Sequence, residues 1–74
     1  MLNAVILLKV VPTKSDLTLE KVLKMDCVRK AYDTYGRFDI TVFVEVKDYQ
    51  MMVEITNEVN GLEGVRSTET LLEA

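Results

Sequence analysis

The stretch YGRFDITVFVEV, residues 35–46, decides the fold of this chain. A glycine at a turn leads into a run rich in β-branched residues, a pattern typical of a strand. Successive side chains of a strand point to opposite faces, so we assign this strand one fully apolar face and one mixed face. The apolar face is formed by Ile40, Val42, Val44 and Val46, and the mixed face carries Asp39, Thr41, Phe43, Glu45 and Lys47.

The segments on either side show their own periodicity. Gly36 allows a tight turn before the strand, and Asp48 is a candidate N-cap for a helix after it. Near the N-terminus, Pro12 stops an apolar strand, and Thr13 or Ser15 is a candidate cap for the next helix. The segment at 26–35 suits an edge strand with a bulge. We therefore predict strands over 2–11, 26–35, 38–46 and 64–73, and helices over 13–24 and 48–60.

The order βαββαβ favours an α+β ferredoxin-like sandwich, with a four-stranded antiparallel sheet and two helices on one face. The 74 residues form a single domain, residues 1–74, too small to bury a large core alone. Two helices cover only one face of such a sheet, and the other face carries enough apolar surface to mark an interface. We expect a two-fold dimer through that open face. The expected contacts are Val5, Leu7, Val11, Thr41 and Phe43.

Composition argues against several classes of function. The chain has no histidine and a single cysteine, Cys27, which is more simply a small hydrophobe of an edge strand than a nucleophile, so we expect no enzyme, metal or cofactor. The formal charge of −3 opposes nucleic-acid binding. RNA-recognition motifs share this strand order but stack bases on aromatics, which the first strand lacks. No segment is a convincing signal peptide or membrane span, so a cytoplasmic location is expected.

Polar groups gather at the start of the strand at 38–46 and again in RSTET, residues 66–70. Together these groups match a free amino acid, because a carboxylate suits its ammonium and N–H, O–H or arginine donors suit its carboxylate. An alternative remains open: YGRFD is simply a turn in which Asp39 caps backbone N–H groups, and STET is ordinary strand composition. The candidate groups are Gly36, Arg37, Asp39, Ser67, Thr68 and Thr70.

The same residues carry a resemblance to a known family. YGRFDITVFVEVKD followed by LEGVRSTETLL resembles the RAM domain (regulation of amino-acid metabolism) of the Lrp/AsnC transcriptional regulators. The family pattern places G-x-x-D before the third strand, here Gly36 and Asp39. A G-V-x-x-t-x-T strand follows the second helix, and here it is represented by Gly64, Val65, Thr68 and Thr70. The match covers essentially the whole chain.

The resemblance implies sheet-to-sheet dimers assembled into an octamer or a similar ring, with an amino-acid effector bound between dimers. By analogy, Asp39 would take the ligand ammonium, and the turn at Gly36 and Arg37 its carboxylate. Thr68 or Thr70 would add hydroxyl contacts, and Tyr35 would wall the pocket. The family's regulators carry a helix-turn-helix domain before this module and none precedes Met1, so we expect no direct DNA binding.

Two functions stay open at this level. The chain would bind an amino acid and change its assembly in response, or it would act mainly as a protein partner that co-assembles with full-length regulators. A small dimeric α+β barrel enzyme shares the fold but is disfavoured by the missing histidine. Amino-acid-binding ACT domains share the strand order, and only the motif spacing separates them from this chain.

Overall fold

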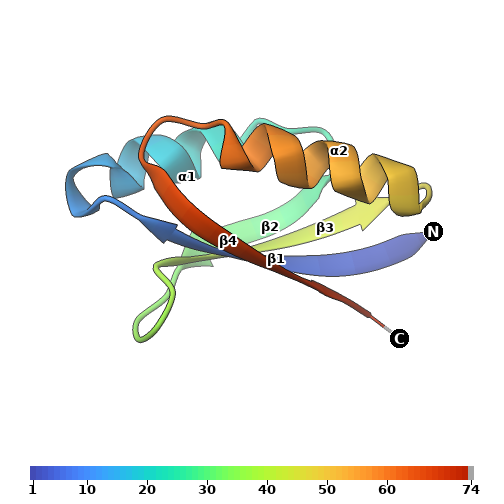
Figure 1. Cartoon of the computed structure of the whole chain (residues 1–74), viewed down its shortest axis with the longest axis horizontal. Helices are drawn as coiled ribbons and strands as arrows, with labels where there is room; N and C mark the ends of the chain where they lie inside the picture. The colour runs from blue at the N-terminus through green and yellow to red at the C-terminus, as the bar shows by residue number, and fades with distance from the viewer. Residues whose placement is uncertain (74) are drawn as a thin grey trace.

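The computed structural model describes residues 1–73 and confirms the predicted element order, with a short 3-10 turn added before the first helix. The sheet is four-stranded and antiparallel, in the order β2-β3-β1-β4. Both helices lie on one side of it (Figure 1). This is the predicted ferredoxin-like α+β sandwich. Its elements are β1 (Leu2–Val10), η1 (Pro12–Lys14), α1 (Ser15–Leu23), β2 (Val28–Asp33), β3 (Ile40–Val46), α2 (Tyr49–Asn60) and β4 (Val65–Leu72).

The hydrophobic core lies between the sheet and the two helices. The four β-branched side chains of β3 that were assigned to one face are all buried there, as are alternate residues of β1. The central strands β1 and β3 pair with Leu8 opposite Ile40 and Ala4 opposite Val44, which brings the two apolar faces into one layer. The helices complete the core with Val22, Met52 and Val59.

The two helices begin differently. Asp48 caps α2 as predicted, because its Oδ1 accepts the backbone N–H of Met51 at 2.9 Å. The predicted side-chain cap of α1 is wrong. The turn at Pro12 starts the helix early, so the N–H of Ser15 already donates to the Pro12 carbonyl, and Lys14 occupies the cap position without a side-chain bond.

The face of the sheet opposite the helices carries the side chains expected at an interface. Val5 lies opposite Phe43, and Leu7 opposite Thr41. Tyr32 of β2 stacks on Phe43 with ring centroids 5.9 Å apart, and the Lys30 ammonium lies 4.7 Å from the centroid of the same ring. We call Val5, Leu7, Tyr32, Thr41 and Phe43 the open face.

Two local irregularities shape the sheet. The predicted bulge in β2 is confirmed, since the register with β3 shifts between Val28 and Lys30. Val11 does not extend β1 as predicted: the strand ends at Val10, and Val11 begins the turn into α1 with its N–H bonded to the Gly64 carbonyl at 2.8 Å. Val11 therefore lies beyond the end of the strand rather than on its open face.

The start of α1 packs closely against the turn that precedes β4. Thr18 is fully buried, and its hydroxyl donates to the Glu63 carbonyl at 3.3 Å. Gly64 has a φ of +93°, and a Cβ built on it would lie 2.5 Å from the Cβ of Lys14. A glycine is therefore required here both for its backbone conformation and for space.

Within residues 1–73, no helix is long and apolar enough to cross a membrane.

Candidate functional site

Asp39 immediately precedes β3 and continues its pairing with β1. Its backbone N–H donates to the Leu8 carbonyl at 2.8 Å, and its side-chain Oδ2 accepts the backbone N–H of Val10 at 2.9 Å. The carboxylate thus takes the place of a backbone carbonyl at the end of the β1–β3 hydrogen-bond ladder. This is the role of capping backbone N–H groups that the sequence offered as an alternative to ligand binding. No group in residues 1–73 hydrogen-bonds to the other oxygen, Oδ1. That oxygen retains its capacity to accept a hydrogen bond.

A shallow pocket of about 270 Å³ adjoins this carboxylate. Asp33, the last residue of β2, contributes a second carboxylate, which accepts the Ser15 hydroxyl at a long 3.4 Å. Asp33 pairs with buried Ile40, so it lies at the end of the sheet on the side of the helices. The pocket also includes Thr34, whose hydroxyl accepts a hydrogen bond at 3.4 Å from the hydroxyl of Thr41 on the open face, so the pocket lies at the end of the sheet and borders that face. The pocket is lined by Val10, Pro12, Ser15, Asp33, Thr34, Tyr35 and Asp39.

Residues 34–39 form the connection between β2 and β3, which hangs from one end of the sheet on the side away from the helices (Figure 1). Thr34 closes its base: the Thr34 N–H donates to the Asp39 carbonyl at 2.8 Å, and its hydroxyl donates to the Phe38 carbonyl at 3.0 Å. Gly36 has a φ of +118°, as expected for a glycine at a tight turn. Tyr35 is fully exposed. Of the predicted residues on this connection, Tyr35 and Asp39 line the pocket, whereas Gly36 and Arg37 do not.

Thr68 and Thr70 lie away from this pocket. They pair with Leu8 and Ile6 of β1, so they face the helix layer, on the side of the sheet covered by α2. The Thr68 hydroxyl donates to Asn60 Oδ1 at 2.8 Å, and the hydroxyls of Thr70 and Thr56 lie 3.3 Å apart. One subunit therefore does not bring these threonines together with Asp39.

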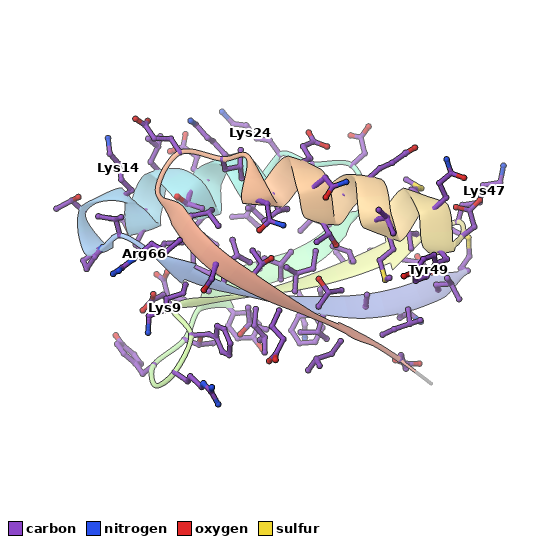
Figure 2. All side chains as sticks on the ribbon, in the orientation of Figure 1. Lys9, Lys14, Lys24, Lys47, Tyr49 and Arg66 are labelled. Atoms are coloured by element: carbon purple, nitrogen blue, oxygen red, sulfur yellow. The ribbon has the colours of Figure 1, made fainter. Side chains whose placement is uncertain are left out.

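Thr70 instead lines a second pocket, of about 260 Å³. The first turn of α2 forms one side of it with Tyr49, which is labelled in Figure 2. Figure 2 also shows Lys9 and Arg66 at the end of the sheet that carries the 34–39 connection, and neither of them lines the Asp39 pocket. The polar groups of β4 and those beside Asp39 are thus two separate sites on one subunit.

Cys27 fits the role of a small hydrophobe. It is buried in the turn before β2, and burial raises the pKa of its thiol above the ordinary value of 9.0, which disfavours the reactive thiolate. A groove of about 540 Å³ between α1 and α2 passes over it. Among residues 1–73, no three histidine, cysteine, aspartate or glutamate side chains converge to hold a metal ion.

The sequence reasoning missed Asp33, Ser15 and Pro12 as pocket residues. Asp33 was hidden inside a predicted strand, and Ser15 was assigned to a helix cap. Pairing of the strands at 26–35 and 38–46 would have placed residue 33 beside residue 40, and hence near Asp39. Pro12 and Ser15 line the pocket only because of the angle at which α1 crosses the sheet. The periodicity of the sequence does not give that angle.

Comparison with known proteins places the chain in a family. The model of the Lrp/AsnC ligand binding domain matches residues 3–72. Protein TTHA0845 from Thermus thermophilus has a similar structure, with a TM-score of 0.96 and 27% identity over 100% of this chain and 94% of that one. FFRP-DM1 gives a TM-score of 0.94 and 29% identity over the full length of both chains. No curated protein matches the chain.

Longer regulators contain the same fold. The transcriptional regulator NMB0573 from Neisseria meningitidis, solved as a complex with L-Met, gives a TM-score of 0.86 at 14% identity. The match covers 99% of this chain and 49% of that one, so this chain corresponds to about half of that regulator, and the likeness at this identity concerns the fold. Since the family model spans nearly all of the sequence, the chain belongs to the Lrp/AsnC ligand binding domain family.

Proposed function

We propose that this protein binds a free amino acid as a small effector and oligomerises in response, as a module involved in the transcriptional regulation of amino-acid metabolism. The observation that carries the proposal is the Asp39 carboxylate, which lines a pocket with one oxygen held by Val10 and the other free of partners in residues 1–73. A carboxylate fixed in this way is a ready acceptor for a ligand ammonium. Membership of a ligand-binding family and the L-Met complex of a protein with this fold support the assignment.

The complete site is proposed to form between subunits. Asp39 accepts the ligand ammonium, and the exposed turn at Gly36 and Arg37 reaches its carboxylate as the ligand enters. Thr68 or Thr70 adds a hydroxyl contact from a neighbouring subunit, because neither threonine lines the Asp39 pocket of its own subunit. Tyr35 forms the outer wall.

Assembly is proposed to begin with a two-fold dimer through the open face. Val5, Leu7 and Phe43 are only half-buried in the isolated chain, and an aromatic stack and a cation–π contact concentrate apolar area there. The Asp39 pocket lies at the end of the sheet, beside this interface, where further dimers in an octamer or similar ring would contact it. Val11, as the N-cap of η1 beyond the end of β1, lies outside the open face that forms this interface.

The function proposed for these residues is binding without catalysis or a cofactor, in the cytoplasm, and without direct contact to DNA. The raised pKa of the Cys27 thiol and the absence of histidine from the sequence support a non-enzymatic role.

A second candidate function is co-assembly with full-length Lrp/AsnC regulators without a ligand. The apolar open face favours it, because a partner with the same fold would present a matching surface.

A thermal-shift screen against the free amino acids tests the proposal, with Asp39→Asn as the binding variant. A ligand that binds only the folded state raises the melting temperature by mass action. Asparagine keeps an oxygen acceptor for the Val10 N–H but lacks the charge, so folding is retained while ammonium binding is lost. A flat response from the folded wild-type protein would contradict effector binding. Co-purification with a full-length regulator in that case would favour the second candidate.

A further inference from the structure

The groove of about 540 Å³ between α1 and α2 has apolar residues on both of its walls. The end of α1 and the turn that follows it form one wall, and one face of α2 forms the other. Met25 on the first wall and Met51, Ile55 and Leu62 on the second are half-buried, because they pack against the core on one side only. Unbranched methionine side chains adapt readily to a surface packed against them.

The two walls of this groove carry opposite charges. Lys21 and Lys24 lie on the α1 wall, and Glu58 lies on the α2 wall. The Lys24 Nζ lies 3.8 Å from a carboxylate oxygen of Glu20, and Lys24 projects from the outer side of the helix layer (Figure 2). Lys21 and Glu58 are exposed, and within residues 1–73 neither forms a salt bridge. Each wall therefore presents a charge that has no partner in its own subunit.

The carboxylates beside the groove act on the thiol that it passes over. Burial raises the pKa of Cys27, and the negative charges of Glu58 and Asp26 raise it further. Like Glu58, Asp26 forms no salt bridge with another residue of the range 1–73. A cation brought to this wall from outside the subunit would therefore meet two carboxylates that are not yet neutralised.

We infer that this groove is covered by the same groove of a second copy of the chain, in a two-fold contact between helix layers. A two-fold axis exchanges the two walls, so a second copy carries the opposite charges in the arrangement that the first one requires. Lys21 of each copy pairs with Glu58 of the other, which gives two equivalent ion pairs. Met51 and Ile55 pack between them. The contact is separate from the open face and from the Asp39 pocket, and it does not depend on the proposed function.

Sedimentation equilibrium of the full chain carrying Leu7→Glu tests this contact, because a charge at Leu7 opposes pairing through the open face and leaves the groove free to pair. We expect a monomer–dimer equilibrium that shifts with protein concentration. Lys21→Glu and Glu58→Lys should each raise the dissociation constant tenfold or more, since each brings like charges together twice in one dimer. The two reversals combined should restore the starting value, because the ion pairs form again with their charges exchanged.

Lys47→Glu is the matched control, since it makes the same change of charge at an exposed residue that does not line the groove, and it should leave the dissociation constant unchanged. A folded Leu7→Glu chain that stays monomeric at every concentration overturns the inference. A dimer that neither reversal weakens, or that the combined reversals do not restore, also overturns it.

If Leu7→Glu does not fold, the same reversals are made in the wild-type chain. Each single reversal should then lower the mass of the largest assembly, and the combination should restore it. An equal mass for the wild type and all three variants overturns the inference.

Discussion

The backbone N–H of Val10 donates to the Oδ2 of Asp39 across 2.9 Å, so the side chain of one residue completes the hydrogen-bond ladder of another strand. The bond is partly buried and joins the end of β1 to the start of β3. The same carboxylate therefore supports the fold and is positioned to meet a ligand.

Substitution at Asp39 should separate these two roles. Asp39→Ala leaves the Val10 N–H without its acceptor, and we expect the free energy of unfolding to fall by about 1–3 kcal/mol. Asp39→Asn should recover most of that stability because its amide oxygen accepts the same bond. Urea unfolding without ligand measures both variants. Equal losses in the two variants would show that charge, not the hydrogen bond, supports the fold at this position.

Gly64→Ala should be strongly destabilising. The new Cβ would lie 2.5 Å from the Lys14 Cβ and impose a φ of +93° on alanine, so we expect a loss of about 2–4 kcal/mol from strain and displaced packing of α1. Gly36→Ala is the matched control, since its φ is +118° but nothing lies within 4 Å of the added Cβ. It should cost only the backbone strain, about 1–2 kcal/mol. Denaturant midpoints at constant m-value give the comparison.

A charge on the open face should prevent dimer formation. Leu7→Glu places a carboxylate among apolar and aromatic side chains that would be covered in the proposed dimer, and burying it unpaired is unfavourable. Light scattering after gel filtration should give a lower mass for this variant than for the wild type. Leu23→Glu, at an exposed position of α1, should leave the mass unchanged. If Leu7→Glu keeps the wild-type mass while folded, the interface lies elsewhere.

Cys27 should make stability fall at alkaline pH. Burial raises the pKa of the folded thiol above 9.0, so the unfolded chain loses its proton at a lower pH than the folded chain. The stabilising contribution of the neutral thiol is present below pH 9 and is lost as pH rises through the folded pKa. Relative to Cys27→Ala, the wild type should therefore lose stability as pH rises above 9 and through the raised pKa of the folded thiol. Parallel unfolding midpoints for the two proteins across that range would contradict this prediction.

Much of the fold followed from periodicity. The alternation in β3 and β1 identified the buried faces, and Gly36 and Asp48 marked a turn and a helix start that the structure contains. The start of α1 was less predictable, because Pro12 can either end a strand or begin a helical turn, and here it does both. The residue at the cap position of α1 depends on which of these roles Pro12 takes, and here no side chain caps the helix.

The candidate site was less accessible to sequence reasoning than the fold. The motif singled out Asp39, and Asp39 and Tyr35 both line the pocket, while their part in binding a ligand stays a prediction. Thr68 and Thr70 belong to the same strand and the same motif. Because side chains alternate along β4, both hydroxyls face α2. No local sequence pattern gives the distance from these threonines to Asp39. Under the proposed function they would meet a ligand only through a second subunit, and contacts between subunits leave no local pattern in the sequence.

The Asp39 pocket lies at one end of the sheet, whereas Tyr32 and Phe43 stack on the open face, and this separation bears on how related proteins diverge. Tyr35 lines the pocket and takes no part in the Tyr32–Phe43 stack. Under the proposed function, duplicated copies of such a gene would diverge in the metabolite that they bind while their products still recognise one another. A cell with several copies would then form mixed assemblies that respond to more than one nutrient.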